Sequence, residues 1–143
     1  LAQLIEVKSF RNALTVQTQL AKPEDEKFNI GAIFNGDFEK NLVTKPNIFD
    51  WKLNEGLQPA IGPNSSQKRG GSFSLFFQYN SDNGKDLKTI QQTVVVESGK
   101  NYKLEGFYRS ELKGLGMVKI EVLDAMDSKV LGSVETELNA KDW

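Results

Sequence analysis

The spacing of apolar residues changes near Phe28, and this change constrains the fold more than any other feature of the sequence. Before Pro23 the apolar residues recur at nearly helical intervals, no glycine interrupts them, and the proline ends the pattern. They are Leu1, Leu4, Ile5, Phe10, Leu14 and Leu20. We therefore expect a helix over residues 1–21, while the alternation of Leu14, Val16, Thr18 and Leu20 leaves a strand as the alternative.

After Phe28 apolar and polar residues alternate, which is typical of strands. In residues 72–79, Phe76 shares a strand face with Ser and Gln, so it faces either a second layer or solvent. Turn residues such as Asn83-Gly84 separate the alternating segments. We expect strands at residues 28–34, 72–79, 87–97, 101–110, 116–124 and 129–135, with at most one short strand in the Pro- and Gly-rich residues 56–72.

About seven short strands with no alternating helices predict a mainly β protein, an antiparallel β-sandwich with a short N-terminal helix. The chain has 143 residues, which suits one such domain and a short appendage. We expect residues 1–27 to form the helix and a charged linker, and residues 28–143 to form the sandwich.

Composition excludes several functions. The chain has no cysteine and no histidine, so disulfides, thiolate catalysis, Cys-based zinc sites and Ser-His-Asp triads are impossible. Its 19 acidic residues show no spacing that marks a pair for glycoside hydrolysis, so we expect no enzyme. A net charge of -1 argues against nucleic-acid binding, and the apolar runs are too short to insert into a membrane.

The segment Asn35-Gly36-Asp37-Phe38-Glu39 is open to two interpretations. It fits a turn in which Phe38 returns to the core while the two acidic side chains are solvated. It also fits a hard-cation site, because Asp37 and Glu39 could offer carboxylate oxygens to calcium beside the carbonyl groups of the turn. Two carboxylates do not complete such a site.

Aromatic residues are the candidates for ligand binding, because a sugar ring stacks on a flat apolar side chain and hydrogen-bonds to polar neighbours. The alternative is that each of these aromatic side chains packs in the core of the sandwich. The candidate residues are Trp51, Phe76, Gln78, Tyr79, Asn80 and Arg109.

Several motifs together resemble the family of jelly-roll carbohydrate-binding modules with a galactose-binding-like fold. These motifs are NGDFE at residues 35–39, FDW at 49–51, GGSFSLFF at 70–77 and IQQTVVVESGKNYKLEGFYRS at 90–110. The N-terminal helix is also similar to the junction at which such a module follows tetratricopeptide-like helical repeats in bacterial proteins. The resemblance implies a non-catalytic carbohydrate-binding module in a larger bacterial envelope or secreted protein, with an extracellular or periplasmic location.

In that family two further strands normally follow the position of Trp143, and an Asp-rich last strand helps to bind a structural calcium ion. The resemblance therefore implies a sandwich truncated at its C-terminus, with weak calcium binding at Asp37 and Glu39 or none, and no other cofactor. The partners it implies are a glycan and other domains of the parent protein. The rival hypothesis is a protein-interaction or structural β-sandwich that caps a tetratricopeptide-like region.

Overall fold

The computed structural model of the chain describes residues 1–23, 25, 27–80, 86–114 and 116–143. The described residues divide into two compact units, which we treat separately. The first contains the described residues of 1–79 and 86–102, and the second contains Asn80 and the described residues of 103–143. The turn expected at Asn83-Gly84 lies outside the described residues.

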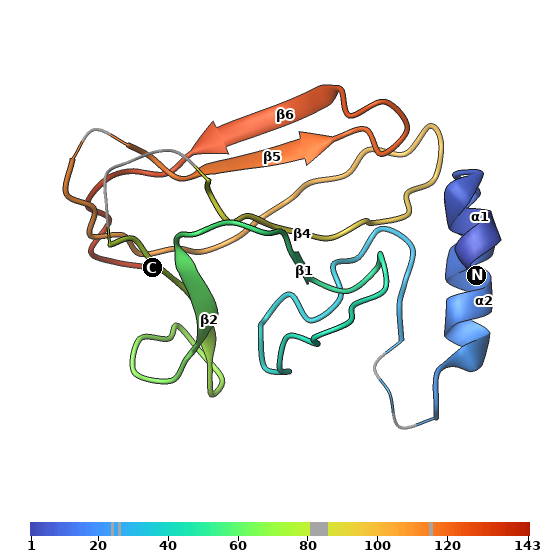
Figure 1. The fold of residues 1–143 in the computed structure, drawn as a ribbon, viewed down its shortest axis with the longest axis horizontal. Helices are drawn as coiled ribbons and strands as arrows, with labels where there is room; N and C mark the ends of the chain where they lie inside the picture. Colours follow the sequence, from blue (N-terminus) through green and yellow to red (C-terminus); the bar gives the residue numbers. More distant parts are fainter. Residues whose placement is uncertain (24, 26, 81–85, 115) are drawn as a thin grey trace. The chain divides into compact units, whose positions relative to one another are not determined.

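Two helices lie at one side of the first unit (Figure 1). They are α1, Ala2–Glu6, and α2, Phe10–Leu20. Lys8 separates them with a φ of 56°, which interrupts the helical path. The expected helix is therefore confirmed, as two helices, and the alternative strand is wrong. Within α2 the hydroxyl of Thr18 donates to the carbonyl oxygen of Leu14 at 2.9 Å, as a helix permits.

The core of the first unit forms where α2 meets two segments from the rest of this unit. Its buried residues are Ala13 and Leu14 of α2, together with Phe49 and Val95. Phe28 packs at the edge of this core and stacks on Phe34 with 4.2 Å between ring centroids. The helical spacing of the apolar residues thus provides one wall of the core.

The described strands form three two-stranded antiparallel sheets, which confirms a mainly β fold. In the first unit β1, Lys52–Leu53, pairs with β4, Ile90–Gln91, and β2, Ala60–Asn64, pairs with β3, Ser74–Gln78. In the second unit β5, Lys119–Leu123, pairs with β6, Val130–Glu135. Strand β2 is the single short strand expected in the Pro- and Gly-rich segment.

The strand expected over residues 28–34 is wrong, because these residues form turns and irregular backbone. Gly31 has a φ of 74°, and the side-chain amide of Gln92 bonds to both the N–H and the carbonyl oxygen of Phe34 at 2.9 Å. Residues 101–110 also form no strand, and only Ile90–Gln91 of residues 87–97 do. Alternation shows which side chains can share a face, but a ladder also needs a partner strand in register.

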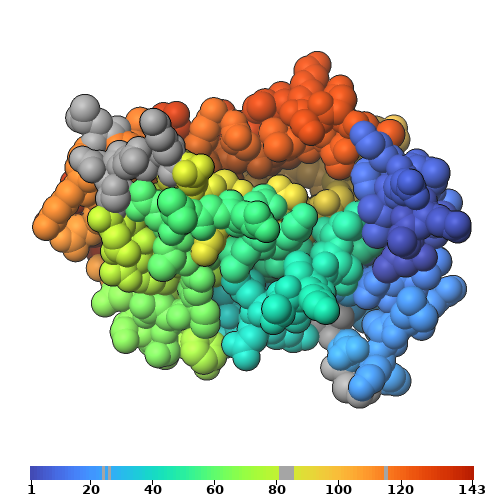
Figure 2. Space-filling view, in the orientation of Figure 1, coloured from blue at the N-terminus to red at the C-terminus, as the bar shows by residue number. Residues whose placement is uncertain are grey.

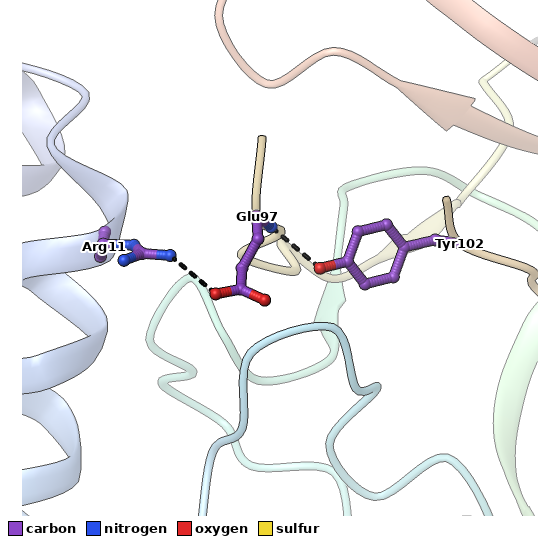
Figure 3. Close-up of polar contacts among 3 residues, drawn as sticks. All are labelled: Arg11, Glu97 and Tyr102. Carbon is purple, nitrogen blue, oxygen red and sulfur yellow. Dashed lines mark hydrogen bonds and ion pairs between the residues drawn. The ribbon is translucent and has the colours of Figure 1, made fainter. Parts of the chain in front are cut away.

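A polar contact joins α2 to the segment that follows Val95 of the core (Figure 3). Arg11 Nη2 lies 3.5 Å from Glu97 Oε1, and the backbone N–H of Glu97 donates to the hydroxyl of Tyr102 at 2.9 Å. Both charged side chains are largely exposed, so the ion pair contributes little to stability. Apolar packing of Leu14 is the stronger attachment of the helix.

Candidate functional site

A buried asparagine organises the loop that contains Asp37 and Glu39. Asn35 is only 4% exposed and has a φ of 48°, a conformation that asparagine adopts more readily than most residues. Its side-chain Nδ2 donates to the carbonyl oxygen of Lys40 at 2.9 Å, and its Oδ1 accepts the N–H of Lys40 at 3.0 Å. The side chain of Asn35 therefore links the first residue of this loop to its last residue, Lys40.

Trp51 is attached to the same loop. Its indole Nε1 donates to the carbonyl oxygen of Asn35 at 3.0 Å, and its ring lies 5.3 Å from the ring of Phe38. The side chain is half-buried. The contacts of Trp51 with Asn35 and Phe38 fix its orientation, and part of its surface remains accessible.

The two predicted metal ligands have different surroundings. Glu39 Oε1 accepts the backbone N–H groups of Ser72 at 2.8 Å and Phe73 at 3.0 Å. These two bonds hold the pKa of Glu39 below its ordinary value of 4.5, and the bond from Phe73 has the larger effect. Asp37 is exposed, and its Oδ1 accepts only a long bond from the N–H of Glu39 among the contacts described, at 3.4 Å. Glu39 therefore fixes a loop that lies far away in the sequence.

No group of three or more acidic side chains that could hold a metal ion occurs within the described residues. One oxygen of Glu39 already accepts two N–H groups, so a cation would have to use Oε2. The calcium site at Asp37 and Glu39 stays a prediction.

The β2–β3 pair presents an open aromatic side chain. Phe76 is 42% exposed, and its partner across the pair is Gly62. A Cβ at Gly62 would have no atom within 4 Å, so the position opposite Phe76 on β2 is uncrowded. Gln78 lies two residues along the same strand face, is exposed, and pairs with Ala60. We call Phe76, Gln78, Gly62 and Ala60 the platform; β2 and β3 belong to the green and yellow-green atoms visible in Figure 2.

The structure brings only some of the predicted ligand residues together. Tyr79 follows β3 directly, and partial burial raises the pKa of its phenol, so the hydroxyl remains protonated and can donate. Asn80 is exposed and belongs to the second unit. Arg109 also belongs to the second unit, where its guanidinium carbon lies 5.9 Å from the ring centre of Trp143. The platform is therefore described without Asn80 and Arg109.

Sequence reasoning missed two residues that shape this region. Gly62 had a signal, because a glycine inside a short strand often marks a place where something approaches closely. No sequence signal indicated the role of Asn35, because Asn-Gly alone predicts a turn and not a buried side chain that spans the loop.

A pocket in the first unit is lined mainly by apolar residues of the core, including Leu14, Phe28, Phe34 and Phe49. Its volume is about 10 Å³, room for about one water molecule, whereas ligand pockets usually measure about 300–1,000 Å³. The platform on β2 and β3 is therefore the better candidate for a ligand.

Across the described part of the chain, no helix has both the length and the apolar character needed to span a bilayer. Comparison with models of known protein families, with curated proteins and with solved structures gives no match to this chain.

Proposed function

We propose that the chain is a non-catalytic binding module that binds a glycan on the platform of β2 and β3. The observation that supports this proposal is the exposed Phe76 ring opposite Gly62, with the amide of Gln78 on the same strand face. A sugar ring has an apolar C–H face and a rim of hydroxyl groups. One open aromatic ring and one adjacent amide match these two features.

The jelly-roll, galactose-binding-like architecture is the finer part of this proposal, and it rests on the motifs at residues 35–39, 49–51, 70–77 and 90–110. The same motifs support a role within a larger bacterial envelope or secreted protein. The 19 acidic residues show no spacing that marks a carboxylate pair for glycoside hydrolysis, which supports binding without hydrolysis. Trp51 and Tyr79 stay predicted glycan contacts outside the platform, because Trp51 packs on the loop of Asn35 and Phe38 and Tyr79 alternates to the strand face opposite Phe76 and Gln78.

The test is a glycan array followed by titration calorimetry with the best ligand. We expect Phe76→Ala to weaken binding by about 1 to 3 kcal/mol, because an apolar side chain leaves the contact. Phe107→Ala is the matched control, since Phe107 is also exposed but lies in the second unit. No glycan should be hydrolysed. Equal affinity of Phe76→Ala and wild type for every glycan bound would overturn the platform.

The alternative function is a protein-interaction module that caps a tetratricopeptide-like region of the parent protein. It is favoured by the β5–β6 hairpin, whose apolar side chains are exposed on both faces. These side chains are Ile120, Val122, Leu123, Val130, Leu131 and Val134. The test uses Val122→Ser and Val134→Ser and a purified helical-repeat fragment of the parent protein. The alternative replaces the first proposal if no glycan binds to the wild type and if both substitutions raise solubility and abolish binding to this fragment.

A further inference from the structure

The loop between β2 and β3 is held by local bonds at the end near β2. Asn64 Oδ1 accepts the N–H groups of Ser66 at 2.7 Å and Gln67 at 3.0 Å. The hydroxyl of Ser74 donates to the carbonyl oxygen of Gln67 at 2.5 Å. These bonds close the first half of the loop, residues 64–67, against the start of β3.

The second half of the loop contains Gly70-Gly71, and here a fixing group comes from far away in the sequence. Glu39 Oε1 accepts the N–H groups of Ser72 and Phe73, the two residues that precede β3. The positive charge of Lys68, on the same loop, stabilises the negative charge of this carboxylate. A charged acceptor bound to two backbone donors forms a stronger attachment than a neutral pair.

Gly71 provides the space in which the carboxylate lies. Its φ is 63°, which side chains other than glycine adopt with strain, and a Cβ there would lie 2.7 Å from Glu39 Cδ. The neighbouring Gly70 is different, because a Cβ there would meet no atom within 4 Å. The sequence pair Gly70-Gly71 thus contains one glycine required by the carboxylate and one that is not.

We propose that Glu39 is a positioning residue for the platform: its carboxylate fixes the start of β3 and thereby the place of the Phe76 ring. Phe73 and Phe76 are three residues apart, or about 10 Å along an extended strand. When the first residues of β3 are already fixed, less conformational entropy is lost on ligand binding. The inference rests on the proposed glycan-binding function, but its structural part can be measured without any glycan.

The first experiment places 4-fluorophenylalanine at residue 76 of the full chain and records its ¹⁹F spectrum together with amide hydrogen exchange at Ser72 and Phe73. In Glu39→Ala we expect exchange at both amides to be at least about tenfold faster and the ¹⁹F signal to shift or broaden. Glu39→Gln should restore the ¹⁹F signal, because its amide oxygen can accept the same bonds. Asp37→Asn is the matched control and should leave the spectrum unchanged.

The pair Gly71→Ala and Gly70→Ala keeps the proposal testable if Glu39→Ala does not fold. Gly71→Ala should displace the carboxylate and reproduce the ¹⁹F change, whereas Gly70→Ala should not. An unchanged ¹⁹F signal in both Glu39→Ala and Gly71→Ala, or equal changes in Gly70→Ala and Gly71→Ala, would overturn the positioning role. So would a wild-type ¹⁹F signal that differs from that of Glu39→Ala only when calcium chloride is added, because Glu39 would then act as a metal ligand.

The second experiment titrates cellohexaose, xylohexaose and mannohexaose into the same unlabelled variants. We expect Glu39→Ala to weaken binding about threefold to tenfold and Glu39→Gln to recover most of it. If none of the three binds the wild type, the glycan proposal loses its support, and the ¹⁹F result still decides whether Glu39 positions Phe76. If Glu39→Ala keeps full affinity while its ¹⁹F signal changes, the bonds of Glu39 to Ser72 and Phe73 have a structural role only. That outcome would overturn the role of Glu39 in binding.

Discussion

The loop of residues 35–40 and the β5–β6 hairpin are held together in opposite ways. The loop has no regular backbone structure, yet a buried asparagine closes it and Trp51 and Glu39 attach it to other parts of the first unit. The hairpin has a regular backbone ladder, from Lys119 opposite Glu135 to Leu123 opposite Val130, but all its side chains are exposed. Regular secondary structure and a fixed tertiary environment are therefore separate properties in this chain.

This difference predicts where substitutions matter. A side chain in the hairpin can be shortened without opening a cavity, because water already surrounds it. A side chain in the core of the first unit, or a polar group that closes the loop, has partners that lose their contacts when it is removed. The following predictions test this contrast, from the largest expected effect to the smallest.

Phe49→Ala should have the largest effect on stability. Phe49 is 2% exposed and packs with Leu14 and Val95, so its removal should lower the free energy of unfolding by about 3 to 5 kcal/mol. Val134→Ala in the hairpin, where the side chain is 59% exposed, should change it by less than about 1 kcal/mol. Urea unfolding followed by Trp51 fluorescence in a Trp143→Phe background measures the first unit.

Similar losses in Phe49→Ala and Val134→Ala would contradict the contrast, because they would show that the hairpin is as tightly packed as the core. Circular dichroism of Val134→Ala provides the matching measurement for the second unit, which contains the hairpin.

Asn35→Ala should have the next largest effect. It leaves the N–H and carbonyl groups of Lys40 without their bonds to the side chain and places alanine at a φ of 48°. We expect a loss of about 3 kcal/mol, from the unpaired groups and the strained backbone together. Asn29→Ala is the control, since Asn29 is exposed and its side-chain amide donates to the nearby carbonyl oxygen of Lys27, and it should cost less than about 0.5 kcal/mol. Equal melting temperatures for the two variants would show that the loop does not depend on Asn35.

The sequence predicted the elements that depend on local pattern. The helical segment and the strands β3, β5 and β6 follow from periodicity, whereas β2 lies in a Pro- and Gly-rich segment for which we expected at most one short strand. The expected strand at residues 28–34 failed because Gln92, 58 residues from Phe34 in the sequence, supplies the hydrogen bonds that a neighbouring strand would have made. No local pattern signals a side chain that replaces a strand.

The candidate site was predictable to a similar extent. The polar neighbours of Phe76 in residues 72–79 allowed a solvent-facing ring, and the structure exposes it. The sequence alone left open whether Glu39 would be solvated or would bind a cation, and it did not indicate the bonds that Glu39 accepts from Ser72 and Phe73. The assignment of Arg109 and β3 to different compact units was not predictable, because alternation contains no information about which unit a segment joins.

The smallest expected effect is the pH dependence that Glu39 gives to the first unit. Hydrogen bonds from Phe73 and Ser72 lower the pKa of Glu39 in the folded state. The stabilisation is therefore complete above the ordinary value of 4.5 and is lost as the pH falls through the lower folded-state pKa. Burial raises the pKa of Asp50, whose contribution changes with pH in the opposite sense.

The difference in stability between wild type and Glu39→Gln isolates the Glu39 contribution, because Asp50 is the same in both proteins. We expect this difference to be constant from pH 7 down to about pH 5 and to decrease below pH 4.5. Urea unfolding at each pH, followed by Trp51 fluorescence, provides the values. A Glu39→Gln difference that stayed flat below pH 4.5 would show that the carboxylate does not hold Ser72 and Phe73 in solution, and that the loop before β3 is fixed by its local bonds alone.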